Sequence, residues 1–123
     1  MIDSCQYFAR AFRLGHEFEG RIVIVEVAQF EVDERDHAEF QAVLSRAIEN
    51  ILRRAQGFID CQVLQGIENP SLFSLHIRWQ TLEDHMVTFR EGELFPLWRG
   101  EIGRFFVSAP HVTHANPLYS ITR

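Results

Sequence analysis

Residues 72–79 read LFSLHIRW, and this stretch decides the fold. Apolar and polar side chains alternate along it: Phe73, Leu75, Ile77 and Trp79 on one side, Ser74, His76 and Arg78 on the other. A period of two is typical of a β-strand with one buried face. The strand therefore contributes one face to the core. Its polar second face favours a partner sheet, and so a homodimer.

Three further strands are predicted around this one. Residues 21–30 (RIVIVEVAQF) carry apolar side chains on both faces, which is typical of a central strand covered on both sides. Residues 58–65 form the next strand, and residues 111–115 form the last one after Pro110. If the first and third strands are neighbours, Glu26 is expected to oppose His76 or Arg78.

Two helical regions separate the strands. Asp33 is a helix N-cap, Gly57 closes that helix, and an apolar stripe lies between them: Phe40, Val43, Leu44, Ala47, Ile48, Ile51 and Leu52. Thr81 and Asp84 resemble a capping box that starts the second region. Its inward stripe consists of Leu82, His85, Met86 and Phe89. A break at residues 91–93 precedes a further helix with Pro96 in its first turn.

The order of these elements predicts the fold class. Strand, helix, strand, strand, helix, strand is the order of a ferredoxin-like α+β domain with an antiparallel sheet, βαββαβ. We expect a single domain over residues 21–123, preceded by an aromatic N-terminal arm over residues 1–20.

Composition narrows the classes of partner. The chain has 123 residues, of which 46% are apolar and 24% charged, with a net charge of −5. Its basic residues are all Arg and form no basic run, which argues against nucleic acid as a partner. Without a membrane-length apolar run or a signal peptide, a cytoplasmic protein is expected. Cys5 and Cys61 are expected to be free thiols.

The residues that can carry chemistry are aromatic or ionisable. His85 lies at the buried edge of the second helical region, where burial would lower its pKa and keep it neutral as a base. The alternative is a core histidine bonded to a backbone carbonyl. Trp79 and Trp98 either line an aromatic pocket or are residues of the hydrophobic core without a further role. Arg90 and Arg99 flank the inward stripes, as partners of an anionic oxygen or as solvated charges.

No metal site is predicted. The chain lacks HExxH, CxxC, phosphate-loop and dinucleotide-binding motifs. His111 and His114 are three residues apart, which places them on opposite faces of a strand.

The stretch at residues 79–99, WQTLEDHMVTFREGELFPLWR, resembles the antibiotic biosynthesis monooxygenase family of the dimeric α+β barrel group. The pair GF at residues 57–58 and the run PHVTH at residues 110–114 support this resemblance. It covers about three-quarters of the chain. The resemblance implies a homodimer that oxidises a small hydrophobic phenol, quinol or anthrone with O₂ and no bound metal or flavin. By it, His85 would be the base, and the substrate-binding residues would be Trp79, Phe89, Arg90, Trp98 and Arg99.

Two departures from relatives bear on the reaction. Quinol-oxidising relatives have a His nine residues after the strand-ending Trp, where this chain has Thr88. Haem-degrading relatives have a Trp at that position and a His ten residues later, where this chain has Trp98, so haem degradation is disfavoured. Two alternatives remain open: a dimer that binds a small molecule without catalysis, and an isomerase or decarboxylase of the same fold.

Overall fold

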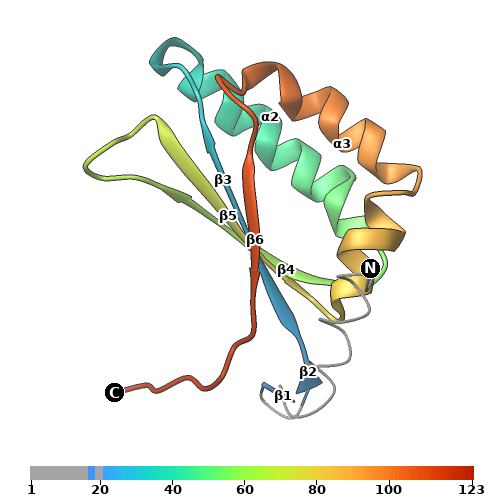
Figure 1. Cartoon of the computed structure of the whole chain (residues 1–123). Helices are drawn as coiled ribbons and strands as arrows, with labels where there is room; N and C mark the ends of the chain where they lie inside the picture. Colours follow the sequence, from blue (N-terminus) through green and yellow to red (C-terminus); the bar gives the residue numbers. More distant parts are fainter. Residues whose placement is uncertain (1–16, 19–20) are drawn as a thin grey trace, which may run out of the picture.

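The computed structural model describes residues 17–18 and 21–123 (Figure 1). Most of the arm predicted over residues 1–20 therefore lies outside the described residues. Within that range, β1 (Glu17–Phe18) pairs antiparallel with β2 (Arg21–Ile22).

The main sheet has four antiparallel strands in the order β4-β5-β3-β6. They are β3 (Ile24–Glu31), β4 (Phe58–Gln65), β5 (Leu72–Trp79) and β6 (His111–Ala115). The first and third strands of the βαββαβ unit, β3 and β5, are thus central neighbours. This order confirms the predicted ferredoxin-like α+β fold.

One face of the sheet is covered by helices, which lie together against it (Figure 1). The four predicted apolar residues of β5 are all buried: Phe73, Leu75, Ile77 and Trp79. On β3 burial alternates, with Ala28 and Phe30 buried and Val25 and Val27 only half-buried. Among the described residues the helices cover one face of this strand, so the prediction that both sides are covered stays a prediction.

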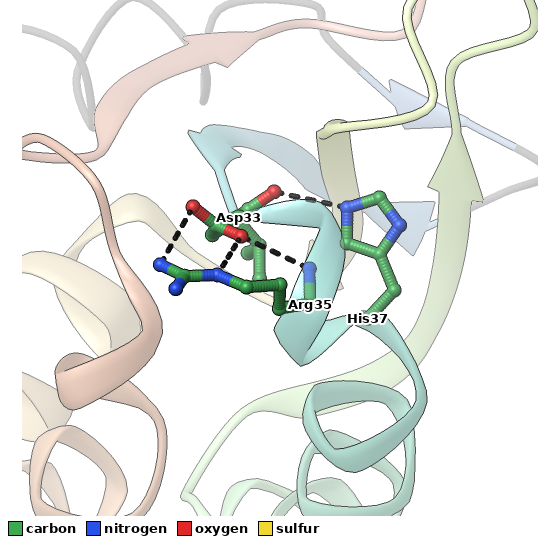
Figure 2. A network of polar contacts seen from close by, with 4 residues as sticks. Asp33, Arg35 and His37 are labelled. Atoms are coloured by element: carbon green, nitrogen blue, oxygen red, sulfur yellow. Dashed lines mark hydrogen bonds and ion pairs between the residues drawn. The ribbon is translucent and has the colours of Figure 1, made fainter.

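The first helical region begins at Asp33, as predicted. The Asp33 carboxylate accepts hydrogen bonds from the backbone N–H of Arg35 at 3.0 Å and from its guanidinium (Figure 2). His37 Nε2 donates to the Val32 carbonyl at 2.9 Å. These contacts fix the short turn η1 (Glu34–Asp36) that leads into α2 (His37–Asn50).

The buried stripe of α2 consists of Phe40, Val43, Leu44 and Ala47. The α-helix ends at Asn50, and the chain tightens into the 3₁₀ turn η2 (Leu52–Arg54), which still buries Leu52 fully. Gly57 follows with a φ of 81°, a conformation that favours glycine. No helix among residues 21–123 has the length and apolarity needed to cross a bilayer.

The second helical region consists of three pieces. The first, η3 (Asp84–Phe89), is a π-helix, and the Asp84 N–H bonds Thr81 Oγ1 at 3.0 Å. After the predicted break come α3 (Leu94–Ile102), with Pro96 in its first turn, and the 3₁₀ turn η4 (Gly103–Phe105). The sequence predicted the position of these helices but not the wider turn of η3.

Most aromatic residues are accounted for by the core. The Phe40 ring lies 5.6 Å from the Phe30 ring, 5.1 Å from that of Phe73 and 5.3 Å from that of Phe105. These edge-on contacts are a favourable arrangement for aromatic pairs. The number of Phe residues is thus not by itself evidence of a binding site.

Candidate active site

A cavity of about 120 Å³ lies between the helix-covered face of the sheet and the second helical region. Its walls are mainly apolar and include Phe30, Leu75, Ile77, Phe89, Phe95, Trp98 and Val112. Four ionisable residues also line it: Glu26, His85, Arg90 and Arg99. A cavity of about 150 Å³ holds one benzene molecule, so this space admits roughly one aromatic ring.

Glu26 is the buried acid of the site. On β3 it lies opposite Ile77 of β5 and His114 of β6, and it is 6% exposed. Its Oε1 accepts a hydrogen bond of 2.9 Å from the indole Nε1–H of Trp79. The prediction that Glu26 opposes His76 or Arg78 is wrong, because the register turns the carboxylate to the helix side of the sheet.

His85 connects this acid to a second histidine. Its Nε2 lies 3.2 Å from Glu26 Oε1, and its Nδ1 lies 2.9 Å from His114 Nε2. The imidazole stacks on the Trp79 indole, with ring centroids 5.2 Å apart and planes inclined by 24°. Three elements meet here, since His85 comes from η3, His114 from β6, and Glu26 from β3.

Burial shifts the ionisation of all three groups. Desolvation raises the pKa of Glu26 to about 7, although the Trp79 hydrogen bond and the charge of Arg90 oppose the shift. Desolvation lowers the pKa of His85 to about 3, with further lowering by His114 and Arg90. The pKa of His114 is lowered by desolvation and by Arg90. Both imidazoles are therefore neutral at pH 7, whereas Glu26 exchanges a proton near that pH.

Neutral imidazoles give the hydrogen bonds a direction. Each ring carries one N–H donor and one acceptor nitrogen. In the 2.9 Å hydrogen bond between His85 Nδ1 and His114 Nε2, one ring therefore donates its N–H and the other accepts. His85 Nε2 lies 3.2 Å from Glu26 Oε1, which keeps the imidazole beside the carboxylate. No buried side-chain N or O atom in the described part of the chain lacks a hydrogen-bond partner, so the network is complete in the interior.

Two arginines border the cavity with their charges unpaired by carboxylates. Arg90 lies 5.7 Å from the Phe95 ring centroid, and Arg99 lies 5.6 Å from that of Phe106. Neither forms an ion pair with an acidic residue in the ranges that the structure describes. One N–H of Arg90 donates to Met86 Sδ at 3.9 Å, and the remaining guanidinium donors are available to an anionic oxygen.

Five of the six predicted site residues line one cavity: His85, Phe89, Arg90, Trp98 and Arg99. Trp79 does not line it, because it is fully buried behind Glu26 and gives its N–H to that residue. Sequence reasoning missed Glu26 and His114 as site residues. The signal for Glu26 was an acid in phase with Ala28 and Phe30, which are buried residues of the same strand.

Other candidates lie apart from the cavity. His111 faces away from the helices and is exposed, as its spacing from His114 predicted. Arg78 pairs with Asp60 at 2.6 Å on the open face of the sheet. Cys61 is a free thiol whose pKa is raised to about 12, first by desolvation and then by Glu26 and Asp60. The described residues contain no group of three His, Cys, Asp or Glu that could hold a metal ion.

Known proteins share this fold. The profile of the antibiotic biosynthesis monooxygenase family matches residues 23–96. The uncharacterised Bacillus subtilis (strain 168) protein YczJ is 27% identical over 92 residues, which cover 75% of this chain and 96% of YczJ. A crystal structure from Bordetella bronchiseptica, classed as an antibiotic biosynthesis monooxygenase, is 32% identical with a TM-score of 0.71, covering 76% of this chain and 94% of that one.

A more distant structure has a bound molecule. The Streptomyces coelicolor monooxygenase from the gene ActVA-Orf6, in complex with the ligand Nanaomycin D, has a TM-score of 0.65 at 16% identity. The match covers 81% of this chain and 91% of that chain. At this identity the likeness shows the shared fold alone.

Proposed function

Because this chain belongs to the antibiotic biosynthesis monooxygenase family, we propose that it oxidises a small hydrophobic phenol, quinol or anthrone with O₂. We propose that it does so without a bound metal or flavin. The observation that carries the proposal is the buried Glu26–His85 pair, 3.2 Å apart, at the wall of an apolar cavity. Such a pair supplies a base at the wall of a space that fits about one ring and is lined mostly by apolar residues.

The reaction requires a base and an oxidant. The base removes a proton from an acidic C–H or O–H bond, and the electron pair of that bond stays on the ring. The electron-rich ring reduces O₂, which adds to carbon as a peroxide and takes up the proton. Loss of one water leaves a carbonyl, as in a quinone. One O₂ is consumed, one oxygen atom enters the product, and the other leaves as water.

The cavity residues have distinct roles in this proposal. Phe89 and Trp98 are walls on which a flat ring packs. Arg90 and Arg99 stabilise negative charge on a phenolate or enolate oxygen, because their donors are not used by acidic residues of the described chain. Trp79 acts from behind the site by holding Glu26.

Oxygen consumption tests the proposal. Purified protein is incubated aerobically with hydroquinones, naphthols and anthrones, and O₂ uptake is compared between wild type, His85→Ala and the control His111→Ala. We expect uptake above the buffer rate in wild type and His111→Ala, and a loss of about 100-fold or more in His85→Ala. Equal rates for wild type and His85→Ala would contradict a role for this site.

The same base without O₂ chemistry would serve an isomerase or decarboxylase. An anaerobic run of the same panel separates these activities, because conversion of substrate would then continue without oxygen. A binder without catalysis would raise the melting temperature of the protein with an aromatic ligand. It would consume no O₂ and convert no substrate.

A further inference from the structure

The geometry of the buried pair decides which of its atoms can meet a substrate. Both ring nitrogens of His85 are engaged, Nε2 with Glu26 at 3.2 Å and Nδ1 with His114 at 2.9 Å. On Glu26, both contacts fall on Oε1, from Trp79 and His85. The other carboxylate oxygen, Oε2, has no hydrogen-bond partner among the described residues, and Glu26 lines the cavity.

We propose that Glu26, through Oε2, is the catalytic residue that removes the substrate proton, and that His85 and His114 are positioning residues that hold its carboxylate. This inference rests on the proposed function in that it names the base of the proposed reaction. It replaces His85 as the group in contact with the substrate. Glu26 is buried on the wall of the cavity, whereas His114 does not line it.

Charge and burial suit Glu26 to this role. A base works best when its pKa is near the working pH, and burial raises the pKa of Glu26 to about 7. The same burial lowers the pKa of His85 to about 3, which makes that imidazole a poor proton acceptor. Trp79 donates to Oε1, which stabilises the ionised carboxylate without occupying Oε2, and His85 Nε2 lies 3.2 Å from the same Oε1.

The proton that leaves the substrate is held by Glu26 and then returned to the oxygenated product. A substrate C–H or O–H bond breaks, its electron pair remains on the ring, and the proton binds Oε2 to give a neutral carboxyl group. After O₂ has added to the ring, the carboxyl proton passes to the peroxide oxygen. Glu26 returns to its ionised form, and His85 and His114 keep their protons throughout.

Anaerobic hydrogen exchange isolates this step from the oxygen chemistry. A one-ring phenol with exchangeable ring C–H bonds, such as resorcinol, is incubated with protein in D₂O, and exchange of these C–H protons above the buffer rate is followed by NMR. We expect exchange in wild type and in the control His111→Ala, and a loss of about 100-fold or more in Glu26→Gln. Circular dichroism and melting temperature establish that each variant is folded.

The pH profile separates a catalytic from a positioning role. In wild type, exchange should rise with pH through an apparent pKa near 7, as Glu26 ionises. His85→Gln and His114→Gln should lower the exchange rate and shift the pH at which it rises. The rise itself should remain, because Glu26 is still present. The opposite result would overturn the proposal and assign the base to His85. In that case the rise of exchange with pH would be lost in His85→Gln and kept in Glu26→Gln.

The two proposals fail in different ways. Exchange that depends on Glu26, without O₂ uptake by any member of the panel, would leave Glu26 as the base and reject the monooxygenase. O₂ uptake unchanged in Glu26→Gln would reject Glu26 as the base and leave the monooxygenase. No exchange and no uptake in wild type would overturn both.

If Glu26→Gln is unfolded, infrared difference spectra of wild type against His85→Gln give the second measurement. A carboxyl band that titrates near pH 7 supports the proposal, and the absence of such a band overturns it.

Discussion

Burial of the Glu26 carboxylate destabilises its charged form and brings its pKa close to neutral pH. A carboxylate that is 6% exposed loses most of its hydration, which disfavours its charge. The Trp79 hydrogen bond to Oε1 and the charge of Arg90 compensate only in part, so the pKa stays near 7. The residue is held in a state where either protonation form is accessible at neutral pH. That is a requirement for a group that accepts and returns a proton.

The free energy of unfolding should depend on pH because of this ionisation. Folding raises the pKa of Glu26 from 4.5 to about 7, so its stabilising contribution is complete below pH 4.5 and is lost as the pH rises to 7. Glu26→Gln removes that dependence. We expect the free energy of unfolding of Glu26→Gln, relative to wild type, to increase by about 1–3 kcal/mol between pH 5 and pH 8. Urea denaturation at both pH values measures it, and a difference independent of pH would contradict the shift.

Gly57 is a second residue at which the structure leaves no room for a side chain. Its φ is 81°, and a Cβ built there would collide with the Asp84 carboxylate. We expect Gly57→Ala to lower the free energy of unfolding by about 2–4 kcal/mol, from backbone strain and this collision. The matched control is Gly100→Ala in α3, where a Cβ meets nothing within 4 Å. That variant should be neutral or more stable by up to about 1 kcal/mol in the same denaturation experiment.

At the scale of elements, η3 determines where the site residues point. The Arg90 N–H bonds the His85 carbonyl at 3.1 Å, five residues back, so the turn is wider than an α-helical turn. This turn contains His85 and Phe89, and Arg90 follows directly. Widened helical turns are frequent at functional sites, because they present side chains that an α-helix would rotate away.

The start of η3 depends on one side chain. Thr81 Oγ1 accepts the Asp84 N–H at 3.0 Å. We expect Thr81→Ala to cost about 1 kcal/mol of unfolding free energy and to reduce catalysis through displacement of His85. Thr88→Ala, at an exposed position of the same helix, is the control and should change the stability by less than about 0.5 kcal/mol. Equal losses in both variants would show that the cap has no special role.

The elements also show how far sequence reasoning reaches. The alternation in residues 72–79 and the turn residues around β4 predicted both strands at the bounds observed, because period-two burial is a local signal. The π-helical turn was missed, since its stripe of Leu82, His85 and Phe89 also fits an α-helix. The contacts of Glu26 and His114 were missed for another reason. They depend on the register of β3 against β5 and β6, which no local pattern specifies.

At the scale of the whole molecule, the sheet face opposite α2 and α3 has no cover within the described chain (Figure 1). Val25 and Val27 are half-buried there, and Leu64 is 38% exposed. The segment after β6 adds Leu118 and Tyr119, which are 69% and 76% exposed. We infer from the uncovered face that two copies associate through their sheets, and the homodimer expected from the sequence stays a prediction.

Light scattering tests this association. We expect the mass of a dimer at micromolar concentration, and a monomeric mass for wild type would reject it. Val27→Glu should shift the equilibrium to monomer, because a carboxylate would be buried in the interface beside His76 and Thr113. Ser45→Glu, on the exposed side of α2, introduces the same charge away from that face and should leave the dimer intact.

The thiol of Cys61 has a consequence for the lifetime of the protein. A site that forms peroxides on its substrate exposes its own sulfur atoms to oxidation, and the thiolate is the form that reacts. Desolvation raises the pKa of Cys61 to about 12, and the charges of Glu26 and Asp60 add to the shift. At pH 7 only about one molecule in 10⁵ carries that thiolate, which follows from the separation of pH and pKa. Burial first, and the charges of Glu26 and Asp60 after it, thus keep the Cys61 thiol protonated and slow its oxidation.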